Sequence, residues 1–247
     1  MNDIELTQRQ IKLLKAILSE FMDTAEAVGS SHLPTKYNIK VSPATIRNEM
    51  MQLGNMGLLS KSHVSSGRKP TSRAFRFFID ELLDDLEEIK GEREAKIRET
   101  IFQHRFSVDR LLYEAVRKLN EITNNISIAV FEDRVYHSGI CELVNYPEYQ
   151  QHRRLKSLLQ VLEDVQTLTD LFQKHAQEDN DVYILIGKDD TGLSSFERTS
   201  IVFGKLYLHG NQVGYLAVIG PDRIDYSQVI PSVKWMIKTV NKSVQGW

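Results

Sequence analysis

The first sixty positions alternate apolar and polar residues at helical spacing. An amphipathic helix is predicted from about Thr7 to Thr24, because its apolar residues step by three, four and three: Ile11, Leu14, Leu18 and Phe21. A short helix is expected at 31–36, followed by a loop at 37–41. The pattern therefore predicts a small helical core at the N-terminus.

A third helix is predicted to begin at Ser42. Serine is a good N-cap, and Pro43 suits the first helical position, where its missing N–H has no helical partner. One side of this helix is apolar and expected to be buried, through Ile46, Met50 and Leu53. The other side is expected to face solvent and carries Ala44, Arg47, Asn48, Met51 and Asn55.

Two short strands are predicted after this helix, at 58–61 and 68–70, with Gly67 marking the tip of the wing between them because glycine tolerates positive φ. A helix-turn-helix followed by such a wing is typical of DNA-binding proteins, in which the second helix reads base edges. Thr45, Arg47 and Asn48 can hydrogen-bond guanine, adenine or phosphate. The candidate DNA-binding residues are Ser42, Ala44, Thr45, Arg47, Asn48, Lys61, His63, Ser65, Arg68 and Lys69.

Local charge favours DNA as the partner of this segment. Between Ser30 and Arg76 there are eight basic residues and one acidic residue, Glu49, although the whole chain carries a net charge of −2. A basic surface of this kind is the electrostatic footprint of a nucleic-acid-binding domain. The remainder of the chain is correspondingly acidic.

A helical connector is predicted at 81–123. Two heptad-like stripes are centred on it, Phe75, Ile79, Leu82, Leu86 and Ile89 in the first, and Val108, Leu112, Ala115, Leu119 and Ile122 in the second. Each spans only about two heptads, which is too short to establish a coiled coil. The stripes either pack within their own domains or contribute to dimerisation, and the sequence leaves both open.

From residue 124 the period changes to that of strands. Strands are predicted at 126–131, 135–144, 182–186, about 200–208 and 212–219, with a tight turn at Gly210-Asn211. One helix containing Leu155, Leu158, Leu162 and Val165 follows the second strand, and a final helix begins near Ser227. The order ββαβββα predicts an α+β domain with a largely antiparallel sheet.

Composition and motifs exclude several classes of protein. The seven histidines are scattered, and neither a phosphate-binding glycine loop nor a nucleophile elbow is present, so we expect no enzyme, no metal and no cofactor. The single cysteine, Cys141, excludes an intrachain disulfide and is expected to be buried in a strand. No apolar run approaches a membrane span and Met1 to Glu5 lacks a signal sequence, which predicts a cytoplasmic protein.

The residues from Leu6 to Asp80 resemble the N-terminal domain of the HrcA family of bacterial heat-inducible transcription repressors. The resemblance rests on the nonapeptide Ser42 to Met50 and on the motifs Gly57-Leu58-Leu59, His63, Ser65, Gly67-Arg68, Pro70-Thr71 and Arg76-Phe77. A second match covers 218–221 with Arg223, Asp225 and Tyr226, and a weaker one covers Gly139, Leu143 and Pro147-Glu148. Asp225 and Tyr226 are expected to cap and pack the last helix.

This chain also departs from the family. Its wing has Ser62, Val64, Ser66 and Lys69 at positions where the family usually has other residues. The strand at 126–131 runs almost directly into Val135, whereas family members carry an inserted domain there. The chain therefore resembles a shortened member of the family.

The resemblance implies three domains, namely a winged helix-turn-helix at 1–80, the connector at 81–123 and a GAF-like domain at 124–247 that serves dimerisation or sensing. It implies a sequence-specific repressor of heat-shock and chaperone genes that binds an inverted repeat in double-stranded DNA as a homodimer. A GroEL-type chaperonin is the implied regulatory partner. The alternatives are a metabolite-sensing winged-helix regulator without a chaperonin link and a scaffold that binds nucleic acid without sequence preference.

Overall fold

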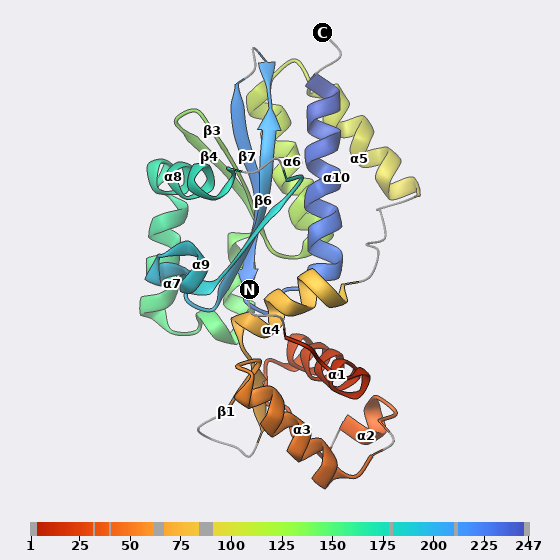
Figure 1. The fold of residues 1–247 in the computed structure, drawn as a ribbon. Coiled ribbons are helices and arrows are strands. Elements are labelled where there is room, and N and C mark those ends of the chain that lie inside the picture. Colours follow the sequence, from red (N-terminus) through yellow and green to blue (C-terminus); the bar gives the residue numbers. More distant parts are fainter. Residues whose placement is uncertain are drawn as a thin grey trace. The chain divides into compact units, whose positions relative to one another are not determined.

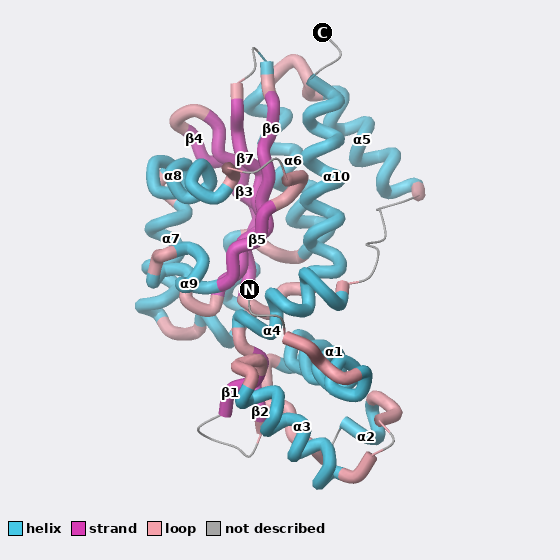
Figure 2. The backbone as a smooth tube through the Cα atoms, viewed as in Figure 1, coloured by secondary structure: helices cyan, strands magenta, loops and turns pink. Residues whose placement is uncertain are grey.

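The computed structural model describes residues 4–31, 33–39, 41–61, 67–83, 91–177, 180–209 and 212–244. Two compact units divide the chain, Met1–Asp85 and Leu86–Trp247, and each is described separately below. Figure 1 and Figure 2 show the elements of both units. No helix in the described ranges is long and apolar enough to cross a membrane.

The N-terminal unit is built on α1 (Gln8–Thr24), α2 (Leu33–Lys36) and α3 (Pro43–Asn55). Thr7 and Gln10 form a capping box at the start of α1, which satisfies two N–H groups that the helix leaves unpaired. Ser42 caps α3 as predicted, since its Oγ accepts a hydrogen bond from the Thr45 N–H at 3.1 Å. The buried apolar residues of α3 are the predicted Ile46, Met50 and Leu53.

The wing pairs β1 (Leu59–Lys61) with β2 (Arg68–Pro70) in antiparallel register. The other edge of β2 is also paired, because Arg68 and Val28 exchange both backbone hydrogen bonds, at 2.8 and 3.0 Å. Helix α4 (Ser72–Phe77) and a π-helical turn, η1 (Phe78–Leu82), complete the unit. The predicted winged helix-turn-helix is therefore confirmed.

Gly67 was explained from the sequence by its tolerance of positive φ, and this explanation was wrong. Gly67 is buried immediately before β2, and its φ is not among the positive values of the described glycines. A Cβ at this position would lie 2.9 Å from the backbone C and O atoms of Ala27. Glycine is needed there because a neighbouring backbone approaches closely, which the sequence alone does not show.

We predict that Gly67→Ala destabilises the N-terminal unit by about 1–3 kcal/mol, because the backbone of Ala27 cannot move away without breaking the Val28–Arg68 bridge. Scanning calorimetry of the full chain measures the effect. Gly54→Ala is the matched control, since its added Cβ would meet Leu59 O at an ordinary 3.5 Å and alanine favours helix. An equal melting temperature for the two variants would contradict the prediction.

The C-terminal unit contains a five-stranded antiparallel sheet with the strand order β4-β3-β7-β6-β5. Its strands are β3 (Ile126–Phe131), β4 (Arg134–Ser138), β5 (Tyr183–Ile186), β6 (Thr199–Tyr207) and β7 (Val213–Pro221). Two residues, Glu132 and Asp133, join β3 to β4. The chain thus passes directly between these strands, as predicted.

Helices cover both faces of this sheet (Figure 1). One face carries α5 (Glu92–Gln103), α6 (Val108–Thr123) and α10 (Tyr226–Val244), which contact one another. The other carries α7 (His152–Leu162), α8 (Val165–His175) and α9 (Gly187–Thr191). Short 3₁₀ turns, η2 (Ile140–Asn145), η3 (Pro147–Tyr149) and η4 (Ser194–Phe196), connect the elements. The predicted α+β class is confirmed, and the arrangement is consistent with a GAF-like fold.

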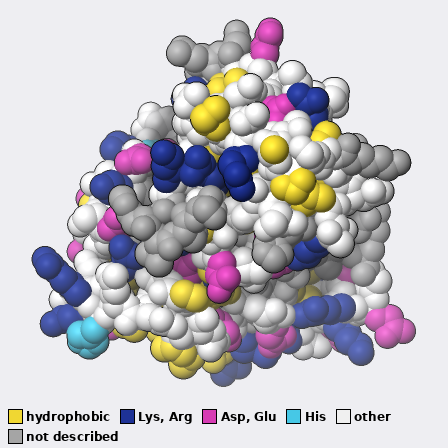
Figure 3. Space-filling model, turned by 90° about the horizontal axis from the view of Figure 1, so that it is seen from below, with side chains coloured by type: hydrophobic (Ala, Val, Ile, Leu, Met, Phe, Trp, Pro, Cys, Tyr) yellow, Lys and Arg dark blue, Asp and Glu magenta, His cyan; other side chains and the backbone are white. Residues whose placement is uncertain are grey.

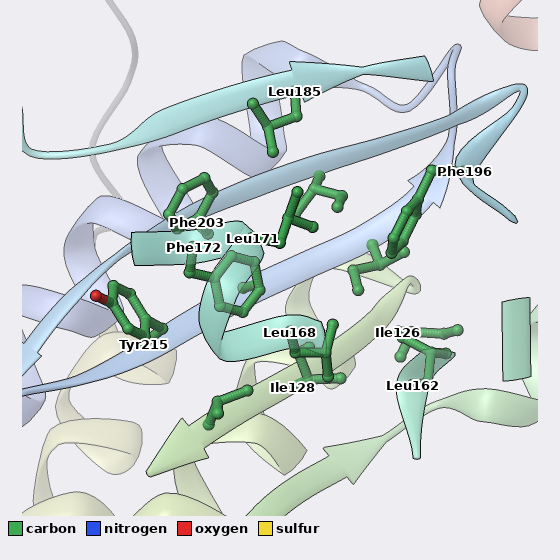
Figure 4. Packing of buried hydrophobic residues seen from close by; sticks show 14 of the residues in the cluster. Ile126, Ile128, Leu162, Leu168, Leu171, Phe172, Leu185, Phe196, Phe203 and Tyr215 are labelled. Atoms are coloured by element: carbon green, nitrogen blue, oxygen red, sulfur yellow. The ribbon is translucent and has the colours of Figure 1, made fainter. Parts of the chain in front are cut away.

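The core between the sheet and helices α7 and α8 is filled by aromatic and aliphatic side chains (Figure 4). The rings of Phe172 and Phe203 stack at 4.6 Å between centroids, and Tyr183 stacks on Phe203 at 5.1 Å. Tyr215 closes the group at 5.4 Å from Phe172. Dense packing on this face fixes α8 against the strands.

The predicted strand at 135–144 was too long, and its cysteine was misplaced. Strand β4 ends at Ser138, because Gly139 takes a left-handed φ of 84° and begins the 3₁₀ turn η2. Cys141 lies in that turn and is exposed. The β-branched and aromatic residues of this segment correctly indicated a strand. They did not show that Gly139 ends it.

The single helix predicted around Leu155 to Val165 is two helices. Helix α7 ends at Leu162, and Asp164 caps the start of α8 by accepting the Thr167 N–H at 3.2 Å. The predicted turn at Gly210-Asn211 lies outside the described residues.

The second connector stripe is used inside the C-terminal unit. Leu112, Ala115, Leu119 and Ile122 are buried in α6, and Val108 is partly buried. Helix α6 contacts β3, β4 and α10. Of the first stripe, Phe75 and Leu82 are buried and Ile79 is partly buried, while Leu86 and Ile89 lie outside the described residues. Packing within a unit, one of the two alternatives, accounts for the α6 stripe.

Candidate nucleic-acid interface

The outward face of α3 presents unpaired polar side chains. Ala44, Arg47 and Asn48 are exposed. The side chains of Arg47 and Asn48 form no hydrogen bond or ion pair with any residue in the described part of the chain. Their donors and acceptors are therefore available to a ligand without breaking an existing contact.

Ser42 and Thr45 have a structural role at the start of α3. Their hydroxyl groups hydrogen-bond each other at 3.0 Å, in addition to the cap that Ser42 Oγ makes with the Thr45 N–H. These contacts fix the first turn of the helix, from which Arg47 and Asn48 project. Between them the two hydroxyls keep one free O–H donor and two lone pairs for further hydrogen bonds, because each hydroxyl has one O–H and two lone pairs.

The wing places two cations opposite each other. Lys61 and Arg68 are register partners of β1 and β2, so both side chains share one face of the ribbon. Like charges directly opposite are unfavourable unless an anion lies between them. Neither side chain forms an ion pair with another described residue. This juxtaposition suits a phosphate group.

Of the remaining wing candidates, the structure describes Lys69 only. The ammonium group of Lys69 lies 6.0 Å from the centroid of the Phe21 ring, over the helical core. His63 and Ser65 lie outside the described residues.

A buried acid that the sequence analysis did not single out holds α3 against α1. Glu49 is 5% exposed, and its Oε1 accepts hydrogen bonds from Nε of Arg9, at 2.8 Å, and from Nη2 of Arg9. Gln10 Nε2 donates to Gln52 Oε1 at 2.9 Å beside this pair. An acidic residue within an apolar stripe, between Ile46 and Leu53, was the available signal, because a buried carboxylate needs a partner.

Some basic side chains of the N-terminal unit are neutralised by acids and others are not, and the unneutralised ones indicate where DNA can bind. Lys36 is neutralised by Glu20, at 2.6 Å. Arg47, Lys61 and Arg68 have no such partner among the described residues. Figure 3 shows Lys and Arg side chains in a row across the face it displays. The arrangement can bind a polyanion.

Two ion pairs of the C-terminal unit have a structural role. Arg223 forms a buried ion pair with Glu148, at 2.8 Å between Nε and Oε1, and Arg198 pairs with Asp222 at 2.6 Å. Burial raises the pKa of the Asp222 carboxyl. Across the described ranges no group of His, Cys, Asp and Glu has the arrangement of a metal site.

Asp225 and Tyr226 have the roles that were predicted for them. Asp225 Oδ1 accepts the backbone N–H groups of Ser227 and Gln228, at 3.1 and 3.3 Å, at the start of α10. Tyr226 is fully buried, and its hydroxyl hydrogen-bonds Ser200 Oγ at 2.6 Å.

Comparison with known proteins assigns both units. A family model for the HrcA protein C-terminal domain matches residues 71–230. A second model, the winged helix-turn-helix transcription repressor HrcA DNA-binding domain, matches residues 5–82. The HrcA matches therefore extend across most of the chain.

Whole-length relatives give the same result. The heat-inducible transcription repressor HrcA of Desulforudis audaxviator is 25% identical over 341 residues, covering 97% of this chain and 98% of the relative. The Clostridium perfringens repressor of the same name is 23% identical over 343 residues, covering 98% and 99%. Both alignments are longer than the 247 residues of this chain, so the relatives carry residues without a counterpart here.

A solved structure supports the fold. A crystal structure described as that of a hypothetical protein at 2.2 Å resolution superposes with a TM-score of 0.78 at 16% identity. It covers 97% of this chain and 99% of that protein. At this identity the likeness shows the fold alone.

Proposed function

Because the chain belongs to the HrcA family of heat-inducible transcription repressors, we propose that it binds an inverted-repeat operator as a homodimer and represses chaperone genes. The N-terminal unit is a winged-helix DNA-binding domain. The observation that carries the proposal is the unpaired Arg47 and Asn48 on the outward face of a capped α3, beside the cationic wing. Such a protein acts in the bacterial cytoplasm, where genes are transcribed.

Individual roles follow from side-chain chemistry. Arg47 presents a planar fork that matches guanine O6 and N7, and Asn48 can bind adenine N6 and N7. Ser42, Ala44 and Thr45 lie in the first turns of the same helix, at the depth where base edges are met. Lys61, Arg68 and Lys69 contact phosphates or the minor groove, together with His63 and Ser65 of the wing.

A dimer is part of the proposal because an inverted repeat has two-fold symmetry. Each protomer places one α3 in a major groove, with the half-sites separated by a whole number of helical turns. We keep 80 and 123 as the proposed domain boundaries, although α6 of the proposed connector packs within the C-terminal unit. The GAF-like domain is the proposed site of dimerisation or sensing. A GroEL-type chaperonin is the proposed regulator.

Fluorescence anisotropy tests this function directly. The full-length chain is titrated against the inverted repeat that HrcA relatives recognise and against a scrambled duplex of equal length, at physiological salt. We expect the repeat to bind at least about a thousandfold more tightly. Equal, salt-sensitive binding to both duplexes would support the scaffold alternative. Sedimentation tests the dimer separately, and a chain that stays monomeric both free and on DNA would contradict it.

The wing makes a separate prediction about salt. Lys61→Ala should weaken binding to the repeat and to the scrambled duplex by the same factor, because phosphates carry no sequence information. The slope of log K against log salt should fall by about 0.9 for the lost phosphate contact in each protomer. Lys188→Ala, on α9, is a control that should leave both quantities unchanged. A loss confined to the repeat would contradict a phosphate role.

A further inference from the structure

Met51 is an exposed apolar residue in the middle of the outward face of α3. It is 52% exposed, whereas its neighbour Met50 is 3% exposed in the core. Isolated exposed apolar side chains are common on protein surfaces and require no explanation by themselves. The position of Met51 relative to the polar residues of the same face gives it significance.

Helical spacing places Met51 directly after the residues proposed to read bases. It follows Arg47 by four positions and Asn48 by three, so the three side chains are neighbours on one stripe of the helix. Ala44, also exposed, lies one turn before them. The stripe therefore presents an apolar group, two hydrogen-bonding groups and a second apolar group in succession.

The polar residues beside this stripe are already engaged. Glu49 is paired with Arg9, and Gln52 accepts a hydrogen bond from Gln10, both on α1. These contacts fix the rotation of α3 about its axis, so Met51 stays on the face opposite α1. Met51 forms no ring contact with another described residue, which leaves its side chain available.

Thymine is the base that an apolar side chain can select in the major groove. It presents a C5-methyl group there, next to its O4 acceptor, and apolar side chains pack on that methyl. Methionine is long and unbranched, so it adapts to a methyl whose position is set by neighbouring hydrogen bonds.

We propose that Met51 is a specificity-determining residue that contacts a thymine methyl group in each half-site, adjacent to the base pairs bound by Arg47 and Asn48. The inference rests on the proposed function, because it requires α3 to enter a major groove. It assigns to this chain a preference for thymine over a base without the methyl group at one position of each half-site.

Deoxyuridine isolates the methyl group, because it differs from thymidine by that group alone and pairs identically. The probe is the inverted-repeat duplex, with each thymine and its symmetry mate replaced by deoxyuridine in turn. We expect the wild-type chain to lose about fourfold in affinity for each contacted methyl at one pair of positions, and nothing at the others.

Variants of Met51 connect that loss to the side chain. Met51→Ala should bind the thymine and deoxyuridine duplexes equally, and so should Met51→Gln, which keeps the length of the side chain but makes its end polar. Met51→Leu should retain the preference for thymine. Tyr113→Ala, which removes a side chain of similar exposure from α6, should behave as the wild-type chain does.

The outcomes separate this inference from the proposed function. A chain that prefers the repeat but shows no deoxyuridine effect, or a Met51→Ala variant that keeps the full effect, would overturn the role of Met51 alone. Equal binding of the wild-type chain to the repeat and the scrambled duplex would overturn both. A deoxyuridine penalty that disappears in Met51→Ala and returns in Met51→Leu would establish the contact.

Discussion

Arg47→Ala is expected to lower the affinity for the operator by about 1–3 kcal/mol in each half-site, or roughly five- to 150-fold per contact. Two protomers contact one inverted repeat, so the effect on the complex includes this loss twice. Arg47 is exposed, and it pairs with no residue in the described part of the chain, so the substitution removes no structural contact. Alanine also favours helix, which should leave α3 intact.

The decisive measurement is the ratio between two affinities. Arg47→Ala should bind the scrambled duplex nearly as well as the wild-type chain, apart from a small loss of general electrostatic attraction. Arg47→Lys keeps the positive charge but lacks the planar fork that binds guanine through two hydrogen bonds, so it should also lose preference for the repeat.

An exposed arginine elsewhere provides the control. Arg153 on α7 is exposed and, like Arg47, is unpaired within the described ranges, so Arg153→Ala changes the charge by the same amount. It should leave both affinities unchanged. If Arg47→Ala weakened binding to the two duplexes equally, Arg47 would be a phosphate contact and base discrimination would belong to other residues of α3.

The interface was predictable from the sequence where local rules determine structure. Ser42 and Pro43 determine where α3 begins, and the spacing of Ile46, Met50 and Leu53 determines which side of it is buried. Together these two local signals place Arg47 and Asn48 on the exposed side. The existence of the wing strands was predictable in the same way.

The contacts that hold this interface in place were not predictable, because they join segments far apart in sequence. Glu49 and Arg9 are separated by forty residues, and the pairing of Val28 with Arg68 involves a segment that was expected to be a connection. Gly67 was noticed for a local property, its tolerance of positive φ, although its neighbour Ala27 explains its presence. Tertiary contacts of this kind leave only indirect signals in a single sequence.

Removing Arg223 should destabilise the C-terminal unit by about 3 kcal/mol or more, because it leaves a buried carboxylate without its main partner. The side chain of Glu148 is 4% exposed, and Arg223 binds both of its oxygens, at 2.8 and 3.3 Å. Arg198 is a second cation near this carboxylate, with its Nη2 3.9 Å from Oε1, and it is already paired with Asp222.

Urea unfolding of Arg223→Ala, followed by tryptophan fluorescence, measures this loss in the correct unit. The two tryptophans of the chain, Trp235 and Trp247, both belong to the C-terminal unit. The control is Arg134→Ala, which breaks the exposed ion pair with Asp109 and should cost much less stability, because solvent screens an exposed pair. If the two variants lost similar free energies of unfolding, burial of the Arg223–Glu148 pair would not increase its contribution to stability.

A double variant distinguishes an uncompensated charge from lost packing. Replacing Glu148 and Arg223 together by Met should recover much of the stability that Arg223→Met loses, because the pair is removed without leaving an unpaired charge. Glu148 and Arg223 lie in two separate segments that resemble the HrcA family, and no local pattern indicates that the two residues meet. Their pairing anchors the loop between β4 and α7 to the segment between β7 and α10, across the end of the sheet. A double variant no more stable than the single would instead assign the stability to packing of the two side chains.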